Sequence, residues 1–178
     1  MRSIIVLIVT VASSMPPVCF GEDESNSEPA DALRAIASVQ NVVLAVSSVD
    51  IPVLRCLTAD ITFLDMDSGK ATYTWHVKTP DSSERKDVRI NYAVGGGAPD
   101  MAVAQINDDT SQSFVAQVVY SNYKSCIVTK FFMGQKEVCF LWEARGTEDA
   151  VPKNCLDAFK QSCGTGVTRY TSDTCNTN

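Results

Sequence analysis

The chain has few of the residues on which enzymatic and metal sites depend. Its 178 residues include a single histidine, His76, and 15 Lys and Arg against 21 Asp and Glu, which gives a net charge of −6 at pH 7. No basic cluster is longer than the stretch Glu84–Lys86, so we expect no nucleic-acid partner. No later apolar run approaches the roughly 20 residues that span a bilayer, and no Asn-x-Ser/Thr acceptor is present. We therefore expect neither membrane insertion nor N-glycosylation.

The first residues have the pattern of a secretory signal peptide. Arg2 supplies a positive charge, and the apolar run Ile4–Ala12 is too short to span a bilayer. Cleavage after residue 21 leaves a mature chain whose size is typical of one domain. We predict a signal peptide at 1–21, a mobile acidic N-terminal arm at 22–29 and a single domain at 30–178. The protein is accordingly expected to be secreted and extracellular.

The cysteines predict disulfides and no catalytic chemistry. Seven are present, and the predicted cleavage removes Cys19. An even number in an oxidising compartment indicates three disulfides, although the residues alone leave their pairing open. With every mature cysteine paired, no thiolate is left as a nucleophile, and one histidine makes a zinc site improbable. We expect no catalytic residue, no metal and no cofactor. The mature cysteines are Cys56, Cys126, Cys139, Cys155, Cys163 and Cys175.

Short β-prone runs separated by turn residues follow a predicted helix at Ala30–Val39. This pattern is typical of an all-β barrel or sandwich, and the turn-like separators favour up-and-down connections. Pro152 and Gly164 frame a second predicted helix at Val151–Cys163, and a last strand is expected at Gly166–Tyr170. The eight main runs are Val42–Ser48, Arg55–Leu64, Ala71–Lys78, Lys86–Val94, Met101–Ile106, Ser113–Tyr120, Ser125–Phe132 and Lys136–Trp142.

Alternation along the strands predicts an apolar, aromatic interior. Tyr73, Trp75 and Val77 alternate with polar residues that include His76, for which a solvated side chain is favoured over a ligand or pH switch. An eight-stranded barrel either packs its interior solid or holds one small ligand, and alternation does not distinguish the two. The candidates for the lining of a cavity are Phe63, Tyr73, Trp75, Tyr92, Phe114, Phe140 and Trp142.

Two further patterns resemble known sites but fit turns better. Asp65 and Asp67 precede Gly69 without a following acidic ligand at the spacing of a calcium loop. Gly95–Gly97 has neither the following helix nor the Lys-Ser/Thr pair of a phosphate-binding loop. We interpret both as hairpin turns.

The last third of the chain carries the most specific motif. A strand ending in Leu141-Trp142 is followed by a loop, the segment Val151-Pro152-Lys153-Asn154-Cys155 and a terminal Cys175. This arrangement resembles the salivary lipocalins of ticks, the family that includes the histamine-binding proteins. The resemblance implies an eight-stranded up-and-down antiparallel barrel with a short N-terminal helix and a C-terminal helix. It also implies three disulfides, pairing Cys56 with Cys175, Cys126 with Cys155, and Cys139 with Cys163.

The resemblance implies ligand capture by a monomer and not catalysis. Amine binders of this family typically carry Asp or Glu directly before Leu-Trp, where this chain has Phe140. The exchange favours a small hydrophobic ligand, such as a fatty acid derivative or a sterol, whose removal would blunt host inflammatory or immune responses. Asp31 or Asp60 could still hold histamine or serotonin, so a scavenger of biogenic amines is the second hypothesis. The third is a barrel whose loops bind a host immune protein or cell.

Overall fold

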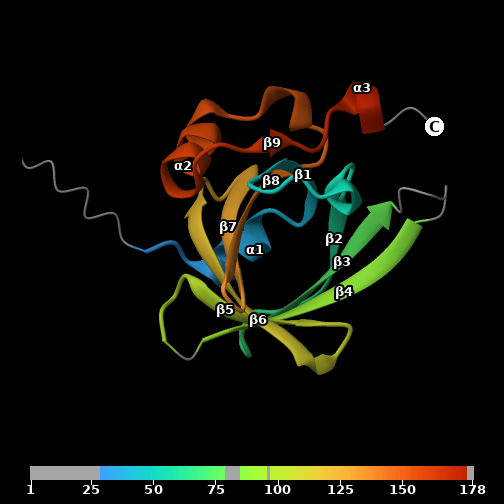
Figure 1. Cartoon of the computed structure of the whole chain (residues 1–178). Coiled ribbons are helices and arrows are strands. Elements are labelled where there is room, and N and C mark those ends of the chain that lie inside the picture. Colours follow the sequence, from blue (N-terminus) through green and yellow to red (C-terminus); the bar gives the residue numbers. More distant parts are fainter. Residues whose placement is uncertain (1–28, 79–84, 96, 176–178) are drawn as a thin grey trace, which may run out of the picture.

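The computed structural model describes residues 29–78, 85–95 and 97–175, so the predicted signal peptide and nearly all of the acidic arm lie outside the described residues. Eight antiparallel strands form a closed barrel, because β1 pairs with β8 on one side and with β2 on the other (Figure 1). Its strands are β1 Asn41–Ser47, β2 Thr58–Asp65, β3 Lys70–Lys78, β4 Arg85–Val94, β5 Met101–Ile106, β6 Asp109–Ser121, β7 Cys126–Met133 and β8 Lys136–Ala144.

Helices and one short strand complete the fold. The helices are α1 Ala32–Ser38, η1 Pro52–Leu54, η2 Glu148–Ala150, α2 Lys153–Cys163 and α3 Ser172–Cys175, and β9 Val167–Thr168 pairs with β1. In the described part of the chain, every helix is too short or too polar to cross a bilayer.

The predicted all-β barrel with flanking helices is confirmed, and the largest differences lie at two strand starts. β2 begins three residues later than expected, because 52–54 form a 3-10 turn and Cys56 has a φ of 55° that interrupts an extended strand. β6 begins four residues earlier, because Asn107 and Asp108 have φ values of 50° and 63° and form a two-residue hairpin turn. Helix α3 was not predicted.

The barrel interior is one apolar core that α1 covers at one end. Asp31 caps the helix, since its Oδ1 accepts a hydrogen bond of 2.9 Å from the Arg34 backbone N–H. The apolar face of α1, with Ala32, Ala35 and Ile36, is buried in the same cluster as the inward side chains of the strands. This helix therefore forms part of the barrel's interior wall.

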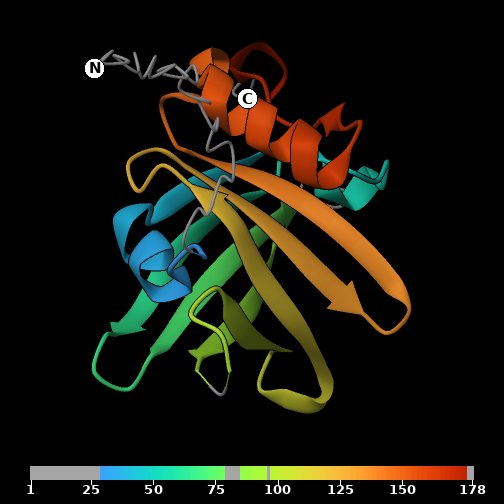
Figure 2. The ribbon, with the colours of Figure 1, turned by 90° about the vertical axis from the view of Figure 1, so that its left-hand side faces the viewer.

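A second core lies on the outer surface of the barrel, under α2. The helix crosses β6, β7 and β8 on the outside (Figure 2). It buries Phe159 and two cystines against outward side chains such as Val128 and Leu141. Because both faces of this part of the sheet are covered, residues 139–143 of β8 are all buried, and the alternation of exposed and buried residues is lost.

The disulfides join the pairs that the family resemblance implies. Cys126–Cys155 and Cys139–Cys163 attach the two ends of α2 to β7 and β8, with Cα–Cα distances of 6.4 Å and 5.9 Å. Cys56–Cys175 attaches the last helix to the segment before β2 across a sequence separation of 119. In the loop-entropy treatment, the disulfides with sequence separations of 24 and 29 contribute on the order of 3 to 4 kcal/mol each, and the one with a separation of 119 contributes about 5 kcal/mol.

Gly166 lets the chain pass closely between α2 and the barrel, which gives a test of this packing. A Cβ on Gly166 would lie 2.3 Å from Val46 Cγ1 and 2.6 Å from Phe159 Cε1. We expect Gly166→Ala to lower the free energy of unfolding by about 1 to 3 kcal/mol through overpacking. Gly97→Ala is the matched control, since a Cβ there meets nothing within 4 Å. Urea unfolding measures both, and equal stabilities of the two variants would contradict this account of Gly166.

Candidate ligand-binding cavity

A small cavity lies inside the barrel, beside α1. Its volume is about 50 Å³, and aromatic rings and alanines make up most of its wall. The lining residues are Ala32, Ile36, Val42, Ala59, Tyr73, Trp75, Tyr92, Ala102, Ala116, Val118, Ile127, Thr129, Phe131 and Trp142. None of them carries a charge, so the cavity wall is apolar apart from a few hydroxyl and indole groups.

Four of the seven aromatic residues singled out from the sequence line this cavity. The rings of Trp75 and Trp142 are 5.2 Å apart, and those of Tyr73 and Tyr92 meet edge to face at 6.1 Å. Strand alternation places the two tyrosines and the two tryptophans on inward faces, as expected. Whether these side chains contact a ligand stays a prediction.

The prediction that Phe63 lines the cavity is wrong, because this residue lies on the outside of the barrel with 51% of its surface exposed. The sequence analysis had named it among the candidates for the cavity lining. The β2–β3 register shifts between Ile61, which pairs with Tyr73, and Phe63, which pairs with the outward-facing Thr72. This bulge adds one residue and inverts the face of the side chains that follow it.

Phe114 and Phe140 point into the barrel interior, as expected, and lie next to the cavity wall; whether either contacts a ligand stays a prediction. Both are buried and pack against Phe131, Phe114 edge-on at a centroid distance of 5.5 Å and Phe140 tilted at 5.1 Å. Phe140 also contacts Trp75 and Trp142 at 6.1 Å and 5.6 Å. The three phenylalanine rings fill the part of the barrel next to the cavity. Two of them, Phe131 and Phe140, pack against the tryptophans of the cavity wall.

Four alanines, which were not among the predicted lining residues, leave the cavity open. Ala59, Ala102 and Ala116 are inward positions on three strands, and Ala32 faces them from α1. A single methyl group at each point leaves space that the neighbouring rings do not fill. The sequence does contain a signal for this open space, namely small residues at inward strand positions between aromatic residues.

Some polar groups of the cavity wall have hydrogen-bond partners within the protein and others do not. The Tyr73 hydroxyl donates a 2.6 Å hydrogen bond to the Val39 carbonyl, and Trp142 Nε1–H donates to Thr129 Oγ1 at 3.2 Å. The Tyr92 hydroxyl has no hydrogen-bond partner among the described residues. Burial raises the pKa of the Tyr73 phenol, and burial together with the neighbouring Tyr73 raises the pKa of the Tyr92 phenol. Both phenols are therefore neutral donors at neutral pH.

The two acids considered as amine partners lie away from the cavity wall. Asp31 is exposed and is engaged as the cap of α1. Asp60 points away from the interior, where its Oδ1 binds Arg145 Nη2 at 2.8 Å and its Oδ2 lies 3.1 Å from His76 Nε2. Neither carboxylate is free to neutralise a cation inside the barrel in this arrangement.

His76 belongs to a charged cluster on the outer face, and is not the simple solvated side chain that the sequence favoured. Its Nδ1 lies 2.7 Å from Asp87 Oδ1, on the opposite side of the ring from Asp60. Strands β2, β3 and β4 bring the three residues together, because each lies on the outward face. Sequence spacing alone does not show this pairing.

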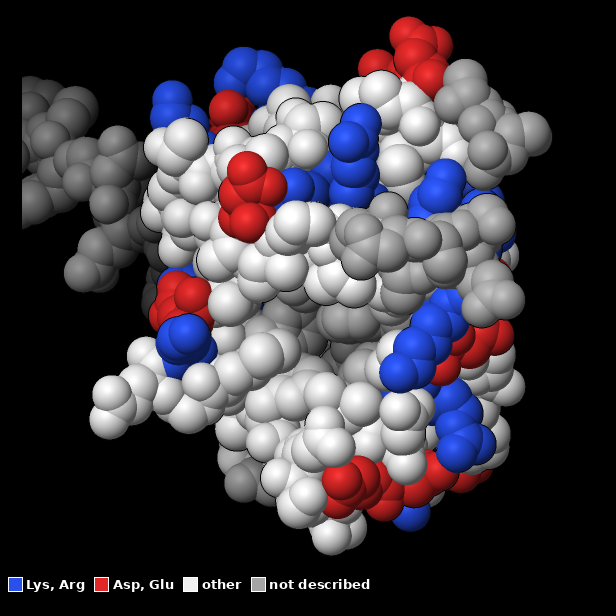
Figure 3. All heavy atoms as spheres, turned by 45° about the vertical axis from the view of Figure 1, so that its right-hand side comes forward, with Lys and Arg blue, Asp and Glu red and all other residues white. Residues whose placement is uncertain are grey.

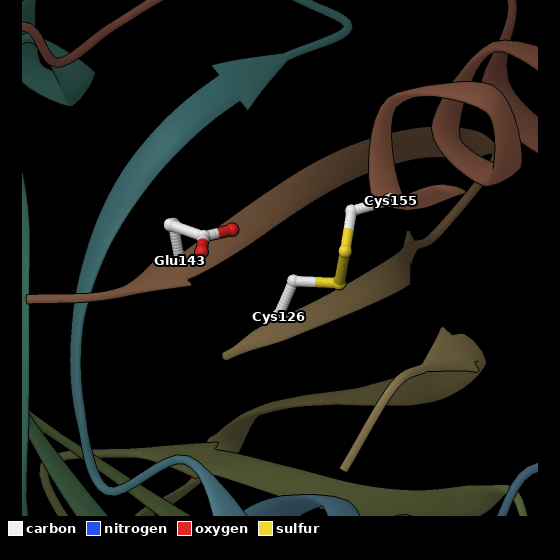
Figure 4. A group of neighbouring side chains, drawn as sticks. All are labelled: Cys126, Glu143 and Cys155. Carbon is white, nitrogen blue, oxygen red and sulfur yellow. A yellow bond between two sulfur atoms is a disulfide. The ribbon is translucent and has the colours of Figure 1, made fainter. Parts of the chain in front are cut away.

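One group of possible metal ligands occurs in the described part of the chain, and its chemistry argues against a metal. Cys126, Glu143 and Cys155 lie close together, but the two sulfurs form a disulfide and offer no thiolate (Figure 4). Glu143 is fully buried and its Oε1 accepts a 2.8 Å hydrogen bond from Thr147 Oγ1. The carboxylate is thus a structural acceptor beneath the loop that follows β8.

Comparison with known proteins gives the family. A family model described as tick histamine binding protein matches residues 21–177. This chain belongs to the tick histamine-binding protein family. The family consists of ligand-binding lipocalins and not of enzymes, and the three disulfides of this member are consistent with secretion.

Solved structures show the lipocalin fold of this family member. AM182 in its serotonin complex is 14% identical with a TM-score of 0.61, covering 81% of this chain and 92% of that one. Japanin from Rhipicephalus appendiculatus, bound to cholesterol, is 10% identical with a TM-score of 0.54, covering 78% and 94%. Lobster apocrustacyanin A1 is 12% identical with a TM-score of 0.55, covering 80% and 84%. A search of curated proteins gives no significant match.

The buried tyrosines predict how stability changes at alkaline pH. Because their folded pKa values lie above the usual value of about 10, the stability from the neutral phenols is complete below that pH and is lost as pH rises further. We expect the phenolate absorbance of Tyr73 and Tyr92 to appear only together with unfolding. Ultraviolet titration monitored in parallel with near-ultraviolet circular dichroism measures this, with Tyr73→Phe and Tyr92→Phe identifying the two contributions. Ionisation of either residue in the folded protein near pH 10 would contradict the raised pKa values of the two phenols.

Proposed function

We propose that this protein is a secreted salivary lipocalin that binds a small, uncharged and mainly apolar molecule inside its barrel. The observation that carries the proposal is the cavity wall, in which no side chain is charged. A buried cation without a carboxylate partner costs several kcal/mol, whereas an apolar ligand gains roughly 25 cal/mol per Å² of buried surface. The wall therefore favours an apolar ligand over an ammonium ion.

The polar group of the ligand is expected at Tyr92. Its hydroxyl, like the indole N–H of Trp75, has no hydrogen-bond partner among the described residues, whereas the Tyr73 hydroxyl is engaged by the Val39 carbonyl. A ligand with one hydroxyl, carbonyl or carboxyl group at the end of an apolar body can satisfy Tyr92. Fatty acid derivatives and sterols both have this character.

The cavity must enlarge before it can hold a sterol or a fatty acid. About 50 Å³ is far below the roughly 300 Å³ at which small-molecule sites commonly begin. A sterol or fatty acid therefore requires the lining rings to rotate, and Trp75 and Tyr92 are candidates because both are only partly buried. The lipocalin japanin, whose solved structure holds cholesterol, has the same fold.

Binding of a biogenic amine is a second candidate, which the aromatic wall supports. Trp75, Trp142, Tyr73 and Tyr92 present ring faces and edges around one small space. Aromatic cages hold cations through their ring quadrupoles, with a gain of up to about 2 kcal/mol for a desolvated cation. The similar fold of AM182 holds serotonin. In both cases the proposed role is removal of a host molecule at the feeding site, which would blunt host inflammatory or immune responses.

Native mass spectrometry of the unheated, secreted protein distinguishes the two candidates. A retained lipid mass supports the apolar ligand. Isothermal titration with oleic acid, cholesterol, histamine and serotonin then gives the order of affinities. Tight binding of histamine or serotonin, together with no uptake of either lipid, would overturn the first proposal in favour of the second.

A cavity-filling substitution tests whether the described cavity is the site. Ala116→Leu places three additional carbon atoms in the cavity wall, so we expect at least a tenfold loss of affinity for the bound ligand. Ala93→Leu is the matched control, because Ala93 is exposed on the outer face of β4. Isothermal titration compares the two variants with the parent protein. Unchanged affinity in Ala116→Leu would place the site elsewhere.

A charge introduced behind the tryptophans distinguishes apolar from cationic ligands. Phe140→Glu puts a carboxylate beside Trp75 and Trp142, and we expect a loss of about 1.4 kcal/mol or more, a tenfold change, for an apolar ligand. Affinity for serotonin should rise in the same variant. Phe140→Leu, which removes the ring without adding a charge, is the control. If both variants changed all affinities equally, packing and not charge would explain the loss.

A further inference from the structure

A second, polar groove lies on the outside of the barrel and shares no lining residue with the interior cavity. Its volume is about 770 Å³. Three parts of the chain form it: the segment between β1 and β2, the end of β3, and the C-terminal segment after β9. The groove and the cavity are therefore independent places for a ligand.

The groove is cationic, although the chain as a whole carries a net charge of −6. Arg55, Lys78 and Arg169 line it, together with the carboxylate of Asp50. Arg55 and Lys78 take part in no ion pair among the described residues. Lys and Arg side chains are prominent on this side of the molecule (Figure 3). Among the described lining residues, three cationic groups and one carboxylate leave two positive charges.

Arg169 is a built feature of the groove and not a mobile surface side chain. Only 6% of its side chain is exposed, and its Nη2 donates to the Val49 carbonyl at 2.6 Å and to Asp50 Oδ1 at 2.7 Å. Its Nε is buried and has no hydrogen-bond partner among the described residues. A buried donor without an acceptor is costly, so this guanidinium favours an acceptor that a ligand supplies.

The walls of the groove are held in place before any ligand arrives. The Cys56 backbone N–H donates to the Arg169 carbonyl at 3.0 Å, and the Cys56–Cys175 disulfide joins the same two segments. Thr171 and Thr174, which are hydrogen-bonded to each other, add hydroxyl groups to the lining. Preorganised donors reduce the entropy that binding would otherwise cost.

We propose that this groove binds the phosphate group of a small phosphate monoester. A phosphate monoester carries about −1.5 to −2 charges at pH 7, which matches the two uncompensated positive charges. Its three terminal oxygens accept hydrogen bonds from guanidinium, ammonium and hydroxyl donors, all of which line the groove. A sulfate ester or a carboxylate brings a single negative charge and matches the groove less well.

The experiment is a titration of the full mature protein with phenyl phosphate, phenyl sulfate and benzoate, which share the ring and differ in the anion. Nitrogen-15 spectra record the backbone amides of residues 168–174 and the side-chain Nε–H of Arg169. We expect saturable shifts at these positions with phenyl phosphate, and at least about tenfold weaker binding of the other two probes. Equal affinity for all three probes, or no saturable shift with phenyl phosphate, overturns the proposal.

Variants that remove either positive or negative charge from the groove provide a second test. The double variant Arg55→Ala/Lys78→Ala should weaken phenyl phosphate at least about tenfold, and Asp50→Asn should strengthen it by removing the opposing charge. Lys70→Ala/Lys136→Ala is the matched control, since it also removes two positive charges, from exposed positions at the start of β3 and of β8 that do not line the groove. Equal affinities in the two double variants would overturn the assignment to this groove. Circular dichroism confirms that each variant is folded.

Discussion

The pairing of β1 with both β2 and β8 closes the sheet, and the properties of the interior follow from that closure. Backbone pairs such as Val42 with Ala59 and Val42 with Ala144 leave no open edge between the first and last barrel strands. Closure also fixes the volume that inward side chains must share. Each inward side chain therefore either fills part of that volume or borders the space that remains empty.

The interior divides into a packed part and an open part according to side-chain size. Phe114 and Phe140 each pack against Phe131, edge-on and tilted respectively, and these rings fill the barrel beside the tryptophans. Ala59, Ala102 and Ala116 leave the space beside α1, which Tyr73 and Tyr92 border. The cavity is thus a consequence of small residues placed opposite large ones, within a scaffold that aromatic stacking keeps rigid.

The outer surface of the barrel carries its own structure, which the disulfides hold in place. Cys126–Cys155 and Cys139–Cys163 keep α2 over β7 and β8, so that this part of the sheet is buried on both faces. Cys56–Cys175 draws the C-terminal segment to the segment before β2 and aligns Arg55 with Arg169 along one groove. The same cross-links that stabilise the fold therefore also shape its second concave surface.

The sequence by itself determined the class of fold, the order of the strands and helices, and the apolar character of the interior, because these depend on local periodicity, turn residues and cysteine number. The family motif around Leu141-Trp142 supplied the disulfide pairing.

Only the tertiary structure decided which side chains border empty space. One bulge turned Phe63 outward, Phe114 and Phe140 pack against Phe131 beside the cavity, and alanines from separate strands open the cavity. The ion pairs of Asp60 and the meeting of Arg55 with Arg169 likewise join residues far apart in the chain. Such contacts depend on register and closure, which are set by the whole sheet and leave no local pattern in the sequence.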